Sequence, residues 1–240
     1  MLMNNLIVNW ENIFAQSSNF KNQKPFKFGF IEGALNKEFY EKLYKTIPKI
    51  DSVWHKTQSS AKSQFVRFWR NTAANDVVND EYDPKFSPEW NEFKKYVSSE
   101  EFIKNFRDFS GIPVNKLKQF HFITCKKGGF QLPHIHNVGP STIIFMFYFS
   151  KNWKKGYPGG TYIANDEDDS KILFEPCNLD NTLALFHDGP KAMHGMRLIT
   201  EDVERMALQI TLEAYTEDKG WSGGNPDELK KEVELEKIEL

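Results

Sequence analysis

The sequence has few cysteines, no long apolar run and almost no net charge, and each of these absences excludes a class of protein. Two cysteines among 240 residues are too few for a disulfide framework or a cysteine-built zinc site. The longest strongly apolar run, Ile143 to Phe149, is far shorter than the roughly 20 residues that a membrane helix needs. No signal-peptide pattern is seen at the N-terminus. The formal net charge of −2 argues against a nucleic-acid or membrane partner, and we expect a cytoplasmic protein.

Aromatic residues are abundant, and the first half of the chain has helical patterns. The 21 Phe, 6 Trp and 8 Tyr residues predict a bulky core or a ring-lined cavity. Asn36 and Ser87 stand where helix N-caps are expected, and Pro88 suits a first helical position. The predicted helices cover residues 36–47, 87–96 and 100–109. We therefore predict that residues 1–115 form an N-terminal helical region that packs on the remaining chain.

After Pro113 the pattern changes to short strands separated by turn residues. The candidate strands are 117–125, 130–136, 142–150, 160–165, 171–175, 182–187, 193–199 and 204–215. Strands of this number and spacing are typical of a jelly roll or a related double sheet. We predict a mainly β core over 116–215, with 216–240 as a charged C-terminal tail or helix.

Five of the six histidines lie in the strand-rich half, and two of them are separated by one residue. His134 and His136 face the same way if their segment is extended. With His194 from a distant strand they would form half of an octahedral site, which leaves the other half open. Imidazole suits Fe, Zn, Cu or Ni, so the residue types do not choose the metal. His187 competes with His194 for the third position, and His121 is expected to be packed or to lie behind the ligands.

The last predicted strand carries a candidate anion site. Arg205 shares a polar face with Ala207, Gln209 and Thr211, and the small residue beside it leaves room for a ligand carboxylate. The simpler interpretation, which spacing alone favours, is that Arg205 forms a surface ion pair.

Residues 118–215 resemble the 2-oxoglutarate- and Fe(II)-dependent dioxygenases, most closely their prolyl-hydroxylase-like branch. Four blocks in the family's order carry the resemblance. They are Cys125-Lys-Lys-Gly128 continuing to His134-Ile-His136, Tyr148 to Trp153 with Pro158-Gly-Gly160, Leu183-Ala-Leu-Phe186 with His194-Gly195, and Arg205. The resemblance implies a double-stranded β-helix preceded and flanked by helices.

The same resemblance implies a cofactor, a cosubstrate and their ligands. Fe(II) would be held by His134, His136 and His194. Arg205, helped by the hydroxyl of Tyr148, would bind the distal carboxylate of 2-oxoglutarate. The implied reaction is the hydroxylation of a small molecule or a peptidyl residue by molecular oxygen, with succinate and CO2 as co-products. The oligomeric state stays open.

Two positions depart from the family pattern. His136 stands where the family has an Asp or Glu ligand, and Cys125 replaces the usual Tyr. His136 is a true third ligand, or it swings aside while a carboxylate such as Asp188, or water, fills the position. As a third alternative, the protein has lost oxygenase activity and keeps only metal or ligand binding.

Two other functions remain open at this point. The spacing from Gly128 to His134 matches a cupin-type metal dioxygenase that uses three histidines and no cosubstrate, although the expected Glu is absent. A non-catalytic metal-binding β-sandwich is the other. Arg67, Trp69 and Arg70 are candidate lid residues over the substrate, or else surface basic residues beside a core Trp.

Overall fold

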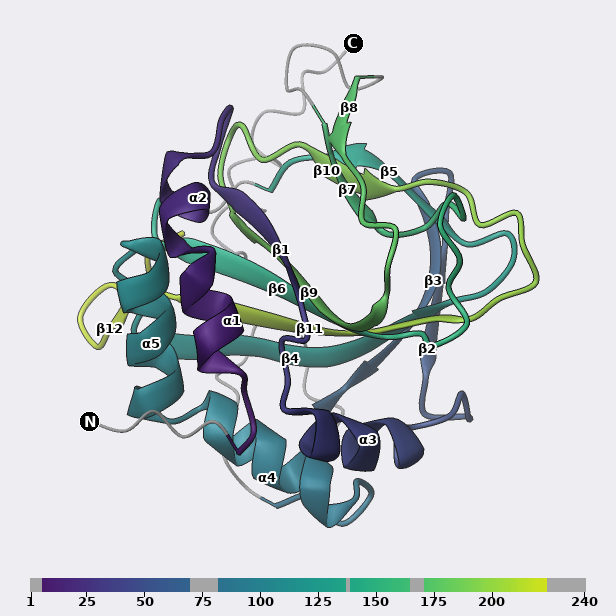
Figure 1. Ribbon diagram of the computed structural model, residues 1–240, viewed down its shortest axis with the longest axis horizontal. Coiled ribbons are helices and arrows are strands. Elements are labelled where there is room, and N and C mark those ends of the chain that lie inside the picture. Colours follow the sequence, from purple (N-terminus) through teal and green to yellow (C-terminus); the bar gives the residue numbers. More distant parts are fainter. Residues whose placement is uncertain (1–5, 70–81, 137–138, 165–170, 224–240) are drawn as a thin grey trace, which may run out of the picture.

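The predicted strands pair antiparallel into one sheet that curls over on itself, and helices cover its outer side (Figure 1). The computed structural model describes residues 6–69, 82–136, 139–164 and 171–223. The helices are α1 Trp10–Ala15, α2 Ser17–Asn22, α3 Lys37–Lys45, α4 Pro88–Val97 and α5 Glu100–Ser110. The first strands are β1 Phe28–Glu32, β2 His55–Gln58, β3 Lys62–Phe68, β4 Lys116–Cys125, β5 Phe130–His134 and β6 Thr142–Phe149. The later strands are β7 Thr161–Ala164, β8 Ile172–Phe174, β9 Asp180–His187, β10 His194–Met196, β11 Arg205–Glu213, β12 Tyr215–Thr216 and β13 Gly220–Trp221.

The strand order explains how two opposed layers arise from one sheet. The order is β1-β9-β6-β11-β4-β3-β5-β10-β7-β8, and β2 pairs with β3. Strand β3 pairs along most of its length with β4 and through Lys62 and Ser63 with β5, so the sheet turns at this corner. Figure 1 shows β5, β7, β8 and β10 on the side of the large layer opposite the helices. The predicted double-stranded β-helix is confirmed, and each of its eight predicted strands is present as one of β4 to β11.

Side-chain alternation along β11 separates a helix-facing core from the interior of the curl. One set of alternating side chains packs with the helices in the larger apolar core: Met206, Leu208, Ile210 and Leu212. The intervening residues Arg205, Gln209 and Thr211 line the cavity between the layers, as the alternation predicts. The aromatic residues mostly fill the helix-facing core, where rings such as those of Phe106 and Phe145 meet edge to face.

The helix boundaries follow the predicted caps. The side chain of Asn36 accepts hydrogen bonds from the backbone N–H groups of Glu38 and Phe39, and that of Ser87 accepts one from Trp90. These bonds satisfy first-turn donors that have no partner within the helix.

The segment before residue 115 contributes strands as well as helices, which differs from the prediction of a mostly helical region. Strand β1 pairs with β9 at one edge of the large layer, and β3 covers a stretch that showed no clear periodicity. Because Val66 and Arg67 are both buried, β3 has no exposed face to produce an alternating pattern. The domain boundary at residue 115 stays a prediction. The predicted tail or helix over 216–240 begins instead with a short hairpin of β12 and β13, and residues 224–240 lie outside the described residues. None of the helices within the described ranges combines the length and apolar character needed to cross a membrane.

Candidate active site

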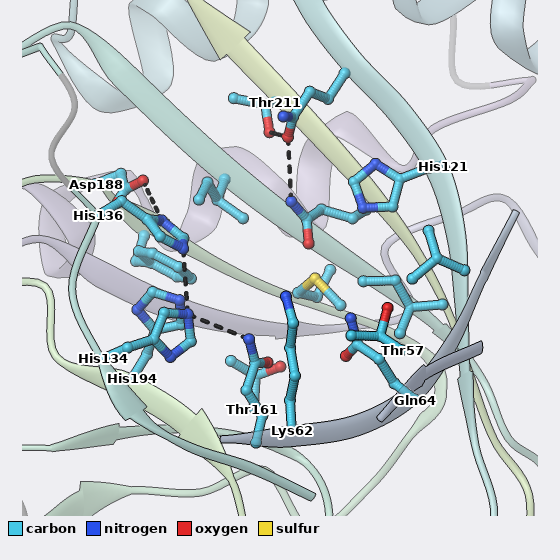
Figure 2. A pocket seen from close by; sticks show the side chains of 18 of the residues that line it. Thr57, Lys62, Gln64, His121, His134, His136, Thr161, Asp188, His194 and Thr211 are labelled. Carbon is cyan, nitrogen blue, oxygen red and sulfur yellow. Dashed lines mark hydrogen bonds and ion pairs between the residues drawn. The ribbon is translucent and has the colours of Figure 1, made fainter. Parts of the chain in front are cut away.

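A cavity of about 440 Å³ lies between the two layers of the curled sheet. Side chains from β3, β4, β6, β9 and β11 form one wall, and side chains from β5, β7 and β10 form the other. Its size falls within the range of about 300–1,000 Å³ that is usual for small-molecule sites. The close-up in Figure 2 shows a histidine cluster on one side of this cavity and polar side chains on the other.

The structure brings His134, His136 and His194 together in the cavity wall. His134 ends β5 and lies directly opposite His194 of β10 in the antiparallel register. One ring nitrogen from each of the three lies within 4.8 Å of the others, and Nε2 of His134 is 3.2 Å from Nε2 of His136. This grouping is a candidate metal centre with three neutral nitrogen donors.

Each of the three imidazoles is held through its other nitrogen. Nδ1 of His134 lies 3.0 Å from the Leu132 carbonyl oxygen, and Nδ1 of His194 lies 2.7 Å from that of Ala192. Nδ1 of His136 lies 2.7 Å from Oδ2 of Asp188. Because an oxygen acceptor requires a protonated Nδ1, the Nε2 lone pairs point toward the centre of the cluster, where Nε2 of His134 also lies 3.2 Å from the side-chain amide of Gln131.

Burial keeps the imidazoles of His134 and His194 in the neutral form that binds metals. Burial lowers the pKa of His134 below its usual range, and repulsion from His136 lowers it further. The pKa of His194 falls well below its usual range because the ring is buried beside the other two imidazoles. Both rings are therefore neutral near pH 7 and available as ligands.

Glycine beside the third histidine permits the close packing of β10 between its neighbours. A Cβ atom on Gly195 would lie 2.4 Å from the Tyr162 hydroxyl and 2.8 Å from the Gln131 carbonyl oxygen. The His-Gly pair is thus a steric requirement of the strand that presents His194.

Asp188 lies behind His136 rather than among the three donor nitrogens. Its side chain is 1% exposed, with Oδ2 at His136 and Oδ1 accepting the Gly189 backbone N–H at 3.0 Å. The alternative in which Asp188 replaces His136 does not match this arrangement, because the carboxylate contacts the nitrogen that faces away from the cluster.

Arg205 forms the cationic end of the cavity. It is 3% exposed, and its Nη2 donates to Oγ1 of Thr161 at 3.0 Å. Its Nε is buried without a hydrogen bond, and no described acidic side chain pairs with it. The simpler interpretation of a surface ion pair is therefore wrong, since the guanidinium is buried and unpaired in the structure as described.

The centroid of the Tyr148 ring lies 5.2 Å from Cζ of Arg205, and the Tyr148 hydroxyl bonds to Thr161. The Tyr148 hydroxyl donates to Thr161 Oγ1 at 2.7 Å and accepts the Thr161 backbone N–H at 3.0 Å. Thr161 lines the cavity, whereas Tyr148 is buried behind it. Sequence reasoning did not single out Thr161, although its position directly after Gly159-Gly160 and at the start of a strand was a usable signal.

Other candidate residues lie away from the site. His187 bonds through Nε2 to the Pro140 carbonyl oxygen at 2.7 Å and is not in the histidine cluster. Arg67 pairs with Asp51 and lies over the Phe86 ring, and Trp69 is buried against the same ring. These two residues do not line the cavity and so do not act as a lid; Arg70 lies outside the described residues.

The comparisons with known proteins agree with this geometry at the level of the fold. No protein-family model and no curated protein matches the sequence. A prolyl-4-hydroxylase from Pseudomonas putida matches over 83% of this chain and 97% of its own, with a TM-score of 0.59 and 9% identity. A Trichoplax adhaerens prolyl hydroxylase, solved with a peptide of hypoxia inducible factor, matches over 95% and 93%, with a TM-score of 0.54 and 13% identity. A Burkholderia pseudomallei oxidoreductase of the 2OG-Fe(II) oxygenase family matches over 90% and 92%, with a TM-score of 0.53 and 12% identity.

These matches cover between 83% and 95% of this chain. At such low identity they establish the fold and leave the reaction to be argued from the site. The resemblance seen in the sequence is confirmed to this extent: the chain has the fold of the prolyl hydroxylases and 2-oxoglutarate- and Fe(II)-dependent oxygenases.

Proposed function

We propose that this protein is an iron(II)- and 2-oxoglutarate-dependent oxygenase that hydroxylates its substrate, with succinate and CO2 as co-products. One observation carries the proposal: the converging nitrogens of three histidines share a cavity with a buried arginine that has no counter-charge. A redox metal and an anionic cosubstrate would satisfy both features together.

The donor set fits iron(II). His134, His136 and His194 would hold the metal through Nε2, because each Nδ1 is already committed to an oxygen acceptor. When bound, iron(II) supplies the redox chemistry by which oxygen and 2-oxoglutarate are consumed. Three neutral ligands carry no negative charge, and buried Asp188 supplies one through its hydrogen bond to His136.

Arg205 and Thr161 would hold the distal carboxylate of 2-oxoglutarate. A guanidinium binds a carboxylate through two parallel hydrogen bonds, and the unpartnered Nε of Arg205 provides one such donor. Tyr148 fixes the hydroxyl of Thr161 by donating to it. Its role is therefore to position Thr161, which modifies the expectation of direct contact between Tyr148 and the cosubstrate.

Apolar side chains between these two ends would exclude water from the reacting groups. Phe186 packs against His194 with ring centroids 4.5 Å apart, and Ile144, Met146 and Ile123 continue the apolar wall. Excluding water strengthens the electrostatic contacts to the bound anion and protects reactive species from side reactions.

The proposal is tested by titrating anaerobic protein with Fe(II) and 2-oxoglutarate while the weak visible charge-transfer band of the chelate is recorded. We expect a band in the wild type that Arg205→Ala abolishes at the same 2-oxoglutarate concentration. Arg197→Ala is the matched control, because Arg197 pairs with Glu175 outside the cavity. His136→Ala shows whether the imidazole of His136 is required for the charge-transfer band to form.

The alternatives predict different results in the same preparation. Bound iron without a 2-oxoglutarate band, together with oxygen consumption and no succinate, would favour a cupin-type three-histidine dioxygenase. Tightly held zinc that iron supplementation does not displace would favour a non-catalytic metal-binding β-sandwich. Either result would refute the proposed function.

A further inference from the structure

A second cation, Lys62, points into the cavity from the corner where the sheet turns. Lys62 begins β3 and pairs with Gln131 of β5, whose side-chain amide lies 3.2 Å from Nε2 of His134. In Figure 2 its side chain extends between the histidine cluster and the side chains of Thr57 and Gln64. Its ammonium group has no hydrogen bond or ion pair to any described residue.

The charges around the cavity leave Lys62 without a counter-ion once the proposed ligands are bound. Lys118 is neutralised by buried Glu213, with Nζ and Oε2 2.5 Å apart. Asp188 is engaged with His136, and Arg205 takes the distal carboxylate of 2-oxoglutarate. The two positive charges of iron(II) equal the two negative charges of the cosubstrate, and the charge of Arg205 equals that of Asp188. The charge of Lys62 is therefore the one positive charge left over in the cavity. A cation in such a partly desolvated site favours an anionic ligand.

The wall that faces Lys62 is polar, and apart from the Lys118–Glu213 ion pair it presents uncharged side chains. Gln209 donates to Gln119, and Thr211 donates to the same amide oxygen at 2.9 Å. His121 is buried with its Nδ1 unbonded, and burial together with the charge of Lys62 lowers the pKa of His121 to about 4. The ring is therefore neutral near pH 7, and this wall offers amide, hydroxyl and imidazole groups that hydrogen-bond to uncharged polar groups.

We propose that Lys62 binds a carboxylate of the primary substrate, and that this substrate is a small organic acid carrying hydroxyl or amide groups. The cavity of about 440 Å³ must hold the cosubstrate as well, which restricts the remaining volume to a small molecule. The acid would lie between Lys62 and this polar wall, next to the histidine cluster. This inference rests on the proposed function, which assigns Arg205 rather than Lys62 to 2-oxoglutarate.

The test measures binding of a panel of α-amino, α-hydroxy and N-acylamino acids, each paired with its primary amide. Binding is followed by the ligand-induced rise in melting temperature, both in metal-free protein and in anaerobic protein loaded with Fe(II) and 2-oxoglutarate. The variants are Lys62→Gln, Lys62→Arg and the matched control Lys56→Gln. Lys56 lies on the neighbouring strand β2, is exposed and does not line the cavity.

We expect at least one acid to stabilise the wild type while its amide does not. Lys62→Gln should weaken binding of that acid roughly ten- to a hundredfold, the loss typical of a charged hydrogen bond. Lys62→Arg should keep the preference for acids, and Lys56→Gln should behave as wild type. The affinity for 2-oxoglutarate should not change in any of these variants.

Three results would overturn the inference. They are an equal response to acids and amides throughout the panel, an unchanged acid affinity in Lys62→Gln, and a weakened 2-oxoglutarate band in that variant. The last result would mean that Lys62 binds the cosubstrate. If metal-free protein shows Lys62-dependent binding of an acid while no 2-oxoglutarate band forms, the proposed function fails and the acid site stands.

Discussion

Asp188→Asn replaces the buried negative charge behind His136 with a neutral group of nearly the same shape. Asp188 is 1% exposed, and its Oδ2 accepts from His136 Nδ1 at 2.7 Å. If this carboxylate makes His136 a stronger donor to the metal, the variant should bind metal more weakly. Loss of such a partner behind a ligand typically costs about ten- to a hundredfold in metal affinity, which is roughly 1.4–2.7 kcal/mol.

The same substitution also perturbs the metal-free fold, and the two effects must be separated. Both carboxylate oxygens accept hydrogen bonds, one from His136 and one from the Gly189 backbone N–H. Asparagine has one acceptor oxygen, so one of these buried donors loses its partner at a cost of about 1–3 kcal/mol. We expect a reduced free energy of unfolding in the metal-free protein as well as weaker metal binding in the fraction that is folded.

The assay is competition between the protein and a coloured chelator for Co(II), with urea unfolding of the metal-free protein measured alongside. Asp180→Asn is the matched control, because Asp180 begins β9, the strand that Asp188 follows, and accepts from the Tyr40 hydroxyl away from the cavity. The reasoning is refuted if Asp188→Asn and Asp180→Asn bind Co(II) with equal affinity. It is also refuted if Asp188→Asn lowers the free energy of unfolding without weakening Co(II) binding.

Three further perturbations test other parts of the site. Tyr148→Phe and Thr161→Val should each weaken 2-oxoglutarate binding by roughly three- to tenfold. If Tyr148 acts through Thr161, the double variant should bind 2-oxoglutarate little more weakly than either single variant. Additive losses of affinity in the titration would indicate that Tyr148 contacts the cosubstrate directly. Because burial lowers the folded-state pKa of His121 to about 4, the unfolded chain binds more protons below pH 6.5, and stability should fall as pH drops toward 4. His121→Gln should make the decrease in the free energy of unfolding between pH 7 and pH 4.5 smaller by about 2–3 kcal/mol, as measured by urea unfolding of the metal-free protein. An unchanged pH dependence would contradict the lowered pKa of His121. Gly195→Ala should shift His194 against Tyr162 and reduce Co(II) affinity, whereas wild-type affinity would show that β10 adjusts freely.

Local sequence patterns predicted those parts of the structure that depend on neighbouring residues. Alternation along the chain identified β11 and separated Arg205 from Met206, and the caps at Asn36 and Ser87 set the starts of α3 and α4. The pairing of His134 with His194 is different, because it depends on β10 being antiparallel to β5. No local pattern contains that register, and the family resemblance assigned His194 rather than His187 as a ligand without predicting how the strands pair.

Lys62 and Thr161 escaped prediction because their roles depend on where the sheet turns and on which layer faces which. Residues 62–68 lack a period because their strand is covered on both sides. The serines at 59 and 60, which lie between two short polar stretches, are a usable hairpin signal in retrospect. Asp188 was noted as a candidate ligand, but the sequence could not show that its carboxylate meets the Nδ1 side of His136.

Under the proposed function, the replacement of a carboxylate ligand by His136 would leave the charge of the site almost unchanged when Asp188 is counted with it. A histidine ligand alone would leave iron(II) with one more positive charge and make its oxidation harder. Asp188, whose Oδ2 lies 2.7 Å from Nδ1, would restore that charge from behind the imidazole, while the Nε2 atom would take the place of the carboxylate oxygen. The Asp188–His136 pair is thus electrostatically close to an aspartate ligand, but it lies on two elements rather than one. Because Asp188 follows β9 and His136 follows β5, the charge at the metal depends on the packing of the two layers, and any substitution that separates them should weaken metal binding before it unfolds the protein.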